Sequence, residues 1–290
     1  MRKILITGKN SYVGNNLKNW LQKYTSQYLV ETMSLRNNSW KEKGVFSGYD
    51  VIFHVAGIAH VSSDPKMEDI YYKVNRDLTF EVAKKAKDEG VKQFIFMSSI
   101  IVYGDSVSHK KIINIDTVPN PSNFYGDSKL QAEESISPLE NEEFKIVIVR
   151  PPMIYGKGSK GNYPKISKLA QRIILFPDFN NERSMIHIDN LCEFIRVIID
   201  NEKTGTFFPQ NNDYVKTSDL VKTISKIHGK RIWMTSLFNP VIKMMFKISI
   251  INKVFGNLVY EKSLSRCDGM VYCIRSFEES IALTELETEK

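Results

Sequence analysis

The chain has 290 residues, 42% of them hydrophobic, and it carries a formal net charge of +7. A chain of this length buries a sizeable core and forms one large domain or two small ones. Its lysines are dispersed and no aromatic-rich basic motif accompanies them, so the charge does not indicate nucleic-acid binding.

The first segment predicts a strand, a turn and a helix. Lys3–Thr7 is a short apolar run, and Asn15–Tyr24 carries apolar residues at helical spacing. The Gly8–Gly14 turn between them suits a dinucleotide, because backbone N–H groups and a helix N-terminus meet the pyrophosphate there. The residues of this turn that we expect to bind a dinucleotide are Gly8, Ser11, Tyr12, Val13 and Gly14.

Three residues of the turn have specific expected roles. Gly8 allows a tight turn, and Gly14 allows the helix to pack closely on the sheet. Ser11 replaces the middle glycine of the usual fingerprint. Its Cβ crowds the pyrophosphate slightly, while its hydroxyl can donate a hydrogen bond. Taken alone, the segment also fits a plain strand-to-helix turn.

The connection after the second predicted strand is short. That strand covers about Leu29–Ser34 and the next begins at Asp50, so only residues 35–49 remain for the helix and third strand that usually follow. We expect this third strand to be truncated or absent, together with the acidic contact to adenine that it normally provides.

The end of the second strand bears on the cofactor. An acidic residue there binds the adenosine ribose in NAD enzymes, whereas a nearby arginine accommodates the 2′-phosphate of NADP. The apolar pattern places Ser34 at this position, with Arg36 two residues on, and a hydroxyl with a guanidinium suits a phosphate. We therefore favour NADP(H). If the register shifts, Glu31 is the acid and NAD(H) is the cofactor; the alternative for Arg36 is a solvated loop charge.

Strands and helices alternate up to about residue 150, which predicts an α/β fold with a parallel doubly wound sheet. The regular alternation ends before a polar glycine-rich loop at Lys157–Asn162, and helical and irregular segments follow this loop. We expect a dinucleotide-binding domain at residues 1–150. A smaller α/β substrate domain is expected at 151–290, with some segments returning to the main sheet.

Tyr125-Gly126-Asp127-Ser128-Lys129 places a phenol and an ammonium one helical turn apart, on the same helix face. A positive charge favours the phenolate, so Lys129 is expected to lower the pKa of Tyr125 from about 10 towards neutrality. A phenol tuned in this way serves as a general acid and base. Ser98 and Ser99 lie roughly 25 residues before this pair in the sequence.

Together, these motifs resemble the extended short-chain dehydrogenases/reductases, specifically the group of nucleotide-sugar epimerases, dehydratases and reductases. The resemblance runs from Thr7-Gly8 to the Phe277–Thr284 region. It implies a Rossmann fold, a nicotinamide dinucleotide and a nucleotide-sugar substrate. It also implies dinucleotide contacts at Ala56 and Gly57, in His54-Val55-Ala56-Gly57, and at Asn75, which begins a long helical stretch.

The resemblance also assigns the catalytic residues. The hydroxyl five positions before the glycine of Val102-Tyr103-Gly104 is Ser99, which would polarise the reacting oxygen, while Ser98 is expected to cap backbone at the strand end. Tyr125 would transfer the proton, and Lys129 would hold the nicotinamide ribose. All three residues are present, which argues against the remote alternative of a non-catalytic dinucleotide-binding sensor.

The two residues after Ser99 bear on the reaction. In the related 4,6-dehydratases an Asp-Glu pair stands there, whereas this chain has Ile100 and Ile101, which cannot transfer protons. We therefore expect no dehydration. We favour NADPH-dependent reduction of a 4-keto-6-deoxy sugar nucleotide. This sugar would be linked to UDP and used for the synthesis of surface polysaccharide. The alternative is an NAD-dependent UDP-hexose 4-epimerase.

Substrate contacts follow from the same resemblance. Arg183, in Arg183-Ser184-Met185-Ile186-His187-Ile188-Asp189, would bind the diphosphate, and Asn162 would contact the diphosphate or the sugar. A turn residue is the alternative for Asn162. Arg266 or Arg275 would supply a second phosphate contact, and neither is preferred. His187 is expected to have a structural role in a buried strand.

The remaining expectations concern environment and assembly. Cys192, Cys267 and Cys273 lack metal spacing and the five histidines are scattered, so we predict no metal site. A Cys267–Cys273 disulfide fits the count, but a cytoplasmic, reduced enzyme is expected. We also expect a homodimer. The apolar Asn239–Tyr260 stretch contains lysines and is too interrupted to span a membrane. It either rests on an anionic membrane or forms a cap or subunit contact, and we favour the latter.

Overall fold

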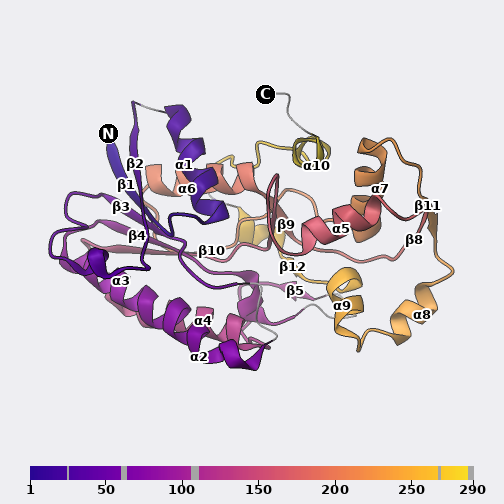
Figure 1. The fold of residues 1–290 in the computed structure, drawn as a ribbon, viewed down its shortest axis with the longest axis horizontal. Helices are drawn as coiled ribbons and strands as arrows, with labels where there is room; N and C mark the ends of the chain where they lie inside the picture. The colour runs from indigo at the N-terminus through magenta and orange to yellow at the C-terminus, as the bar shows by residue number, and fades with distance from the viewer. Residues whose placement is uncertain (25, 60–63, 106–110, 267–268, 287–290) are drawn as a thin grey trace. The chain divides into compact units, whose positions relative to one another are not determined.

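The computed structural model describes residues 1–24, 26–59, 64–105, 111–266 and 269–286 (Figure 1). The chain forms two compact units. The first comprises Met1–Gly104, Val118–Pro151 and Leu191–Pro209. The second comprises Asp105–Thr117, Pro152–Asn190 and Gln210–Lys290. The assignment of dinucleotide and substrate binding to separate domains stays a prediction.

A parallel sheet of six strands forms the centre of the first unit, in the order β10-β6-β4-β3-β1-β2. The strands are β1 (Arg2–Thr7), β2 (Tyr28–Met33), β3 (Val51–His54), β4 (Gln93–Met97), β6 (Lys145–Val149) and β10 (Gly205–Phe207). The inner strands β3 and β4 are buried along their whole length, as expected for parallel strands covered on both faces.

Helices cover both faces of this sheet (Figure 1). They are α1 (Tyr12–Leu21), α2 (Glu68–Tyr71), α3 (Leu78–Asp88), α4 (Phe124–Ile136) and α6 (Ile188–Asp200), and a π-helical segment, Tyr72–Asp77, joins α2 to α3. Small residues of α3 and α4, such as Ala86 and Ala132, pack on Phe94 and Ile146 of the sheet. On α1, the indole of Trp20 donates from Nε1 to Oε2 of Glu193 on α6, at 2.9 Å. The predicted Rossmann-like α/β fold is confirmed.

The predicted loss of a third strand beyond β2 is confirmed for the described residues between β2 and β3. β2 ends the sheet, and residues 34–50 contain a short 3-10 turn, Asn38–Lys41, and no strand. Trp40 and Phe46 from this connection are buried and stack with ring centroids 6.4 Å apart. Two aromatic side chains thus complete the core where a helix and strand are usual.

The second unit has its own core and short paired strands. The pairs are β7 (Met153–Tyr155) with β9 (Met185–His187), β8 (Leu175–Pro177) with β11 (Trp233–Thr235), and β5 (Ile112–Ile113) with β12 (Val259–Tyr260). Its helices are α5 (Asn162–Ala170), α7 (Thr217–Ile227), α8 (Asn239–Met244), α9 (Ser249–Phe255) and α10 (Phe277–Glu285). Tyr155, Phe176, Phe179 and Leu220 lie at the centre of this core.

The apolar stretch Asn239–Tyr260 is divided among α8, α9 and β12. Among the described residues, no helix has the length and apolar character needed to cross a bilayer. Further 3-10 turns lie at Gln22–Tyr24, Pro65–Met67, Ile100–Tyr103, Ser137–Leu139 and Lys262–Ser265.

Candidate active site

Ser99 lies just beyond the C-terminal end of β4, where the central strands of a parallel sheet present their functional groups. Its backbone is extended, and its Oγ accepts from the backbone N–H of Ile101 at 3.3 Å. It therefore caps the 3-10 turn Ile100–Tyr103. The backbone N–H of Ile100 donates to the carbonyl of Pro151 at 2.9 Å, which ties this turn to the segment after β6.

Helix α4 approaches that turn closely. Asn123 caps the helix, because its Oδ1 accepts from the N–H of Gly126 at 3.0 Å. A Cβ added at Gly126 would lie 2.7 Å from the carbonyl oxygen of Ile101. Only glycine therefore permits this distance between the helix and the turn, and Tyr125, the residue before it, lies within hydrogen-bonding distance of Ser99.

Tyr125 is hydrogen-bonded to the Ser99 hydroxyl, but its pKa is not lowered as the sequence predicted. Burial raises the pKa of Tyr125 to about 12, while the hydrogen bond with Ser99 acts in the opposite direction. Tyr71 adds to the apolar environment, with its ring edge-on to Tyr125 at 5.9 Å between centroids. Ser99 and Tyr125, which were each predicted to act on the reacting oxygen, are thus neighbours, and the predicted lowering of the Tyr125 pKa is wrong for the protein on its own.

Lys129 explains why that prediction fails. Its ammonium donates from Nζ to the carbonyl of Met97 at 2.9 Å and lies 4.6 Å from the centre of the Phe96 ring. Burial lowers the pKa of Lys129 to about 8, and Glu133 acts to raise it. The positive charge is therefore balanced by a backbone carbonyl and a carboxylate instead of by the phenol.

Glu133 is a buried carboxylate that the sequence analysis did not identify. It accepts from the Ser98 hydroxyl and from Nε and Nη2 of Arg150, at 3.1 and 2.5 Å for the two guanidinium nitrogens. Ser98 thus binds a side chain and does not cap backbone, which corrects the expectation for it. Arg150 also donates from Nη1 to Tyr103 Oη at 2.6 Å. The sequence signal was its spacing, since Glu133 follows Lys129 by one turn on the same helix face.

The glycine turn after β1 has the close approaches that were expected of it. Gly8 has a φ of 107°, and a Cβ there would lie 3.0 Å from the backbone nitrogen of Ala56. A Cβ at Gly14 would lie 2.4 Å from Ser11 Oγ and 2.9 Å from Ile6 Cγ2. Gly8 therefore allows the backbone of the loop after β3 to lie directly against the turn, and Gly14 allows α1 to lie close to side chains of β1 and the turn.

Ser11 has a local structural role in addition to the predicted contact with the cofactor. Its Oγ accepts from the N–H of Gly14 at 3.0 Å and caps α1, which begins with Tyr12 and Val13. A serine is a favoured helix cap, so its presence in place of glycine has a structural explanation. Dinucleotide binding by Ser11, Tyr12 and Val13 stays a prediction.

Asn75 connects the loop after β3 to helix α4. Its Oδ1 accepts from the N–H of Ile58 at 2.8 Å, and its Nδ2 donates to the carbonyl of Ile58 and to Ser128 Oγ, both at 3.1 Å. A Cβ at Gly57 would lie 3.0 Å from Asn75 Oδ1 and 3.3 Å from Lys129 Nζ. Gly57 thus leaves room for the Lys129 ammonium, and these residues form one connected group.

Ser34 and Arg36 lie beside the glycine turn. β2 ends at Met33, whose carbonyl accepts from the N–H groups of Gly8 at 2.9 Å and Lys9 at 3.2 Å. Ser34 Oγ accepts from the N–H of Arg36 at 3.4 Å, and Arg36 is exposed. Glu31 lies within the strand and accepts from Tyr49 Oη at 2.6 Å. The register therefore places Ser34, and not Glu31, at the strand end.

In the second unit, Arg183 is half-buried beside backbone carbonyls. Its Nη1 donates to the carbonyls of Lys253 at 2.8 Å and Gly256 at 3.3 Å. Desolvation lowers the pKa of Arg183 to about 10, and none of the ion pairs among the described residues includes it. An arginine held in this way retains its positive charge without a neutralising carboxylate.

The other predicted substrate residues differ from Arg183. Asn162 is exposed and is the first residue of α5. Arg275 donates from Nε to Asp189 Oδ2 at 3.1 Å and from Nη1 to Glu279, so two carboxylates already neutralise it. Arg266 is exposed after a 3-10 turn. His187 is buried in β9, and burial lowers its pKa to about 4, in agreement with a structural role.

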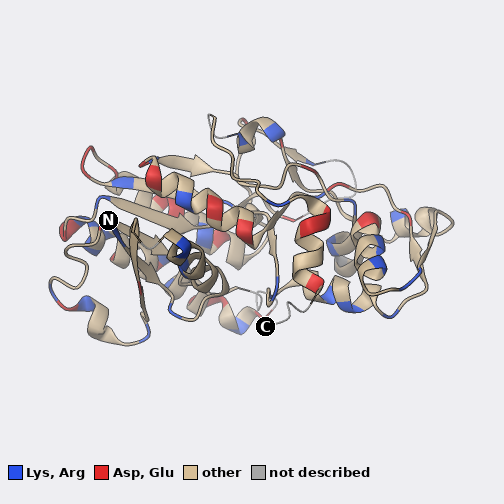
Figure 2. Cartoon of the chain, turned by 90° about the horizontal axis from the view of Figure 1, so that it is seen from above, with Lys and Arg blue, Asp and Glu red and all other residues tan. Residues whose placement is uncertain are grey.

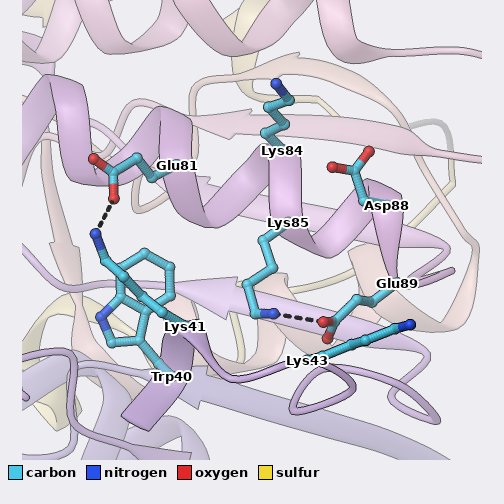
Figure 3. Close-up of a pocket in the computed structure, with 8 residues that line it drawn as sticks. All are labelled: Trp40, Lys41, Lys43, Glu81, Lys84, Lys85, Asp88 and Glu89. Carbon is cyan, nitrogen blue, oxygen red and sulfur yellow. Dashed lines mark hydrogen bonds and ion pairs between the residues drawn. The ribbon is translucent and has the colours of Figure 1, made fainter. Parts of the chain in front are cut away.

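Two hollows on the surface of the first unit lie away from Ser99, Tyr125 and Lys129. One, of about 400 Å³, lies between the Asn38–Lys41 turn and α3 (Figure 3). Lys41 pairs with Glu81 at 2.9 Å there and Lys85 with Glu89 at 2.5 Å, so its charges are mutually neutralised. Another, of about 830 Å³, is lined by residues that include Arg2, Asp50 and Lys92.

Among the described residues, no group of three or more His, Cys, Asp or Glu side chains is placed to hold a metal ion. Cys192 and Cys273 are free thiols. Cys267, His60 and His109 lie outside the described residues, so the possible Cys267–Cys273 disulfide is not tested.

The model of the NAD dependent epimerase/dehydratase family matches residues 4–208. A UDP-glucose 4-epimerase from Vibrio cholerae is 30% identical over 288 residues, covering 89% of this chain and 86% of that protein. N-acetyl-alpha-D-glucosaminyl-diphospho-ditrans,octacis-undecaprenol 4-epimerase from Escherichia coli O157:H7 is 29% identical, covering 70% of this chain and 64% of that protein.

The fold itself is also shared with solved structures. A dTDP-4-dehydrorhamnose reductase from Bacillus anthracis, in complex with NADP, has a TM-score of 0.75 at 19% identity, covering 98% of this chain and 99% of that chain. The likeness to this reductase shows the fold, while the family model and the Vibrio relative extend over most of the sequence. The chain therefore belongs to the NAD dependent epimerase/dehydratase family, with the extended short-chain dehydrogenase/reductase fold.

Proposed function

We propose that this protein is a 4-epimerase acting on a hexose that is attached to a diphosphate. The observation that carries the proposal is the Ser99–Tyr125 hydrogen bond beside a buried Lys129, an arrangement suited to moving a proton at one sugar oxygen. The sequence favoured a reductase. The epimerase is placed first because the Vibrio and Escherichia relatives named above are both 4-epimerases.

The residues of the first unit fit a nicotinamide dinucleotide. Gly8 and Gly57 leave spaces that a Cβ would fill, and Gly57 borders the Lys129 ammonium. The backbone turn capped by Ser11 would bind the pyrophosphate, and Asn75 would hold the loop that contains Ala56 and Gly57. When bound, the oxidised dinucleotide would accept a hydride from C4 and then return it to the 4-keto sugar.

Tyr125 would transfer the proton of the C4 hydroxyl, and Ser99 would donate a hydrogen bond to the oxygen as it gains carbonyl character. The pKa of Tyr125, about 12 in the protein alone, is too high for an efficient base at neutral pH. Lys129 would correct this when its ammonium turns from the Met97 carbonyl towards the ribose and the phenol. Arg183 would bind the diphosphate, with Asn162 as a further contact, because Arg183 has no carboxylate partner among the described residues.

The proposed function is tested by isolating the protein and identifying the dinucleotide that it releases on denaturation. Tightly held NAD, together with interconversion of a UDP-hexose at C4, is the expected result. In Tyr125→Phe we expect turnover to fall by about a thousandfold, the loss of a general acid–base group, with dinucleotide affinity within a few-fold. Asp127→Asn is a control on the same helix, because the carboxylate of Asp127 is bound by Tyr72 and Gln131 and not by the reacting groups. Full activity in Tyr125→Phe would refute the assignment.

The second candidate is NADPH-dependent reduction of a 4-keto-6-deoxy sugar nucleotide, and it is supported by the exposed Arg36 beside Ser34 at the end of β2. In this case Arg36→Ala weakens NADPH binding much more than NADH binding, whereas Lys41→Ala, in the same connection, affects neither. A dinucleotide-free protein that prefers NADPH would support the reductase. Equal effects of Arg36→Ala on both cofactors would remove the argument for it. In either case we predict no 4,6-dehydration, because Ile100 and Ile101 cannot transfer protons.

A further inference from the structure

The second unit exposes an unusual number of large apolar side chains in one segment. We call this the α8–α9 surface. Its most exposed members are Trp233 (75%), Leu237 (82%), Met244 (79%) and Ile250 (68%), and Phe238, Val241 and Ile248 are exposed with them. Single exposed apolar residues are normal on a protein surface. A concentration of them within one short segment marks an interaction site.

Helices α8 and α9 are apolar on both sides. The buried side consists of Ile242 of α8 and of Ile251, Val254 and Phe255 of α9, which pack in or against the core of the unit together with Phe246 between the helices. Val241, Met244 and Ile250 of the same helices are exposed. A surface helix normally has polar residues on its outer side, and a helix that is apolar all round lies in a protein interior or in lipid. The exposed side of α8 and α9 therefore needs an apolar partner.

The strands beside these helices continue the apolar surface. Trp233 of β11 pairs with Leu175 of β8, and the backbone N–H of Trp233 donates to the carbonyl of Ile174 at 2.8 Å. Ile174 and Leu175 are themselves exposed. Paired residues in neighbouring parallel strands lie on the same face, so Leu175 adds directly to the area around Trp233.

The charge of this segment is entirely positive. Residues 220–260 contain no Asp or Glu, and their basic residues are Lys222, Lys226, Lys230, Arg231, Lys243, Lys247 and Lys253. Lys and Arg accordingly predominate over Asp and Glu at the end of the second unit where α7, α8 and α9 lie (Figure 2). Asp178 contacts α8 through its carbonyl, which accepts from Asn239 Nδ2, but its carboxylate is bound by Lys216 at 2.6 Å.

We infer that the α8–α9 surface docks on a bilayer surface that contains anionic phospholipids. The apolar side chains would enter the boundary between headgroups and acyl chains, and Lys243, Lys247 and Lys253 would extend to the lipid phosphates. A second copy of the chain fits less well, because a two-fold interface places the same cations opposite one another. A nucleic acid would use the charges but not the apolar side chains.

This inference differs from the sequence-based expectation, which favoured a cap or subunit contact for Asn239–Tyr260. The exposure of Met244 and Ile250 in the folded unit, which the sequence pattern alone does not give, accounts for the difference. Docking is independent of the proposed reaction, because it uses none of the catalytic residues and can be measured without turnover.

Sedimentation of the full-length protein with vesicles tests the inference. We expect binding to vesicles of phosphatidylcholine mixed with phosphatidylglycerol, much weaker binding to phosphatidylcholine alone, and loss of binding at high salt. The tryptophan emission should shift to shorter wavelength. Trp20 and Trp40 are buried, so the exposed Trp233 would account for this shift.

Two sets of variants separate the charged and apolar contributions. We expect vesicle binding to weaken by about a hundredfold in the triple variant that combines Lys243→Gln, Lys247→Gln and Lys253→Gln, since each cation near an anionic membrane contributes roughly fivefold to the affinity. Lys43→Gln, Lys66→Gln and Lys84→Gln, exposed lysines of the first unit, remove the same charge and should leave binding unchanged. Met244→Ser with Ile250→Ser should also weaken binding, unlike the matched pair Ile115→Ser with Val271→Ser, which is equally exposed.

Three results would overturn the inference. The first is a lack of binding to the anionic vesicles at low salt, and the second is an equal loss of vesicle binding in the two triple lysine variants. The third is a dimer that becomes a monomer on combined Met244→Ser and Ile250→Ser substitution, while no form of the protein binds vesicles. The last result would assign the surface to a second copy. Circular dichroism of each variant shows whether it is folded, and all substituted positions are exposed.

Discussion

Glu133 connects three parts of the candidate site through one buried carboxylate. It accepts from Ser98, the neighbour of Ser99, it pairs with Arg150, and its charge acts to raise the pKa of Lys129. Burial alone would lower that pKa further. The carboxylate thus helps to keep Lys129 in the charged form that the proposed mechanism needs.

We predict that Glu133→Gln destabilises the protein by about 3 kcal/mol, because Arg150 then loses the buried carboxylate with which it pairs. The pKa of Lys129 should fall below its value of about 8, so that activity is lost at a lower pH on the alkaline side. Denaturant unfolding and a pH–rate profile measure the two effects. Glu134→Gln, exposed on the same helix, is the matched control. If activity in Glu133→Gln is lost at the same alkaline pH as before, Glu133 has only a structural role.

His54 makes the stability of the first unit depend on pH. It is buried between Thr7 and Thr79, with its Nδ1 2.8 Å from Thr7 Oγ1 and its Nε2 3.1 Å from Thr79 Oγ1. Burial and the charge of Lys129 lower the pKa of His54 to about 3. In the unfolded chain the same imidazole binds its proton near pH 6.5.

The unfolded state therefore binds more protons between these two values, and the free energy of unfolding should decrease as the pH falls below about 6.5. The loss is about 1.4 kcal/mol for each pH unit, or roughly 2 kcal/mol by pH 5. His54→Gln should reduce the slope. Urea unfolding of both proteins at pH 7 and pH 5 provides the measurement, and identical slopes would show that another group titrates.

At the scale of elements, the contact between α4 and the Ile100–Tyr103 turn sets the distance between Tyr125 and Ser99. Glycine at position 126 allows this contact, since a Cβ there would lie 2.7 Å from the Ile101 carbonyl oxygen and 3.0 Å from Pro121 Cβ. A backbone carbonyl cannot move as easily as a flexible side chain. The helix and the turn must separate if this position acquires a methyl group.

Gly126→Ala tests that contact. An alanine in an exposed helix interior would stabilise by about 1 kcal/mol relative to glycine, so a net loss of stability here reports the clash. We expect kcat to fall by about a hundredfold, because displacement by an ångström disturbs alignment of the reacting groups. Glu134→Ala on the same helix should leave kcat unchanged. A more stable and fully active Gly126→Ala would contradict the assigned packing.

At the scale of the whole molecule, the chain contains two separate cores. Leu5 lies in the core of the first unit and Leu220 in that of the second, and both are almost fully buried. Each unit can therefore respond separately to a substitution in its own core. A dinucleotide bound by the first unit should likewise stabilise that unit through mass action.

We predict that Leu5→Ala and Leu220→Ala each cost about 2–5 kcal/mol, but in different calorimetric transitions. NAD or NADP should raise the midpoint temperature of the transition that Leu5→Ala lowers, and it should leave the midpoint of the other transition unchanged. The opposite result is a single transition that both substitutions and the dinucleotide shift together. It would show that the units unfold as one cooperative body.

The sequence by itself determined the alternation of strands and helices, the glycine turn, the loss of the third strand, and the placement of Tyr125 and Lys129 on one helix. These features follow from local spacing, because chain geometry relates residues a few positions apart. The family could also be inferred, because its motifs occur in order along the chain. Both inferences are confirmed by the fold and the comparisons.

Only the tertiary structure decided the electrostatics and the exposed surfaces. The pKa of Tyr125 depends on its burial and on whether the Lys129 ammonium faces the phenol or the Met97 carbonyl, and Met97 lies far from Tyr125 in the sequence. Glu133 and Arg150 meet only when α4 packs beside β6. In α8 and α9 apolar residues occur on the exposed side as well as the buried side, so periodicity could not show which of them would stay in water. Desolvation and long-range contacts are properties of the folded chain, and local spacing does not contain them.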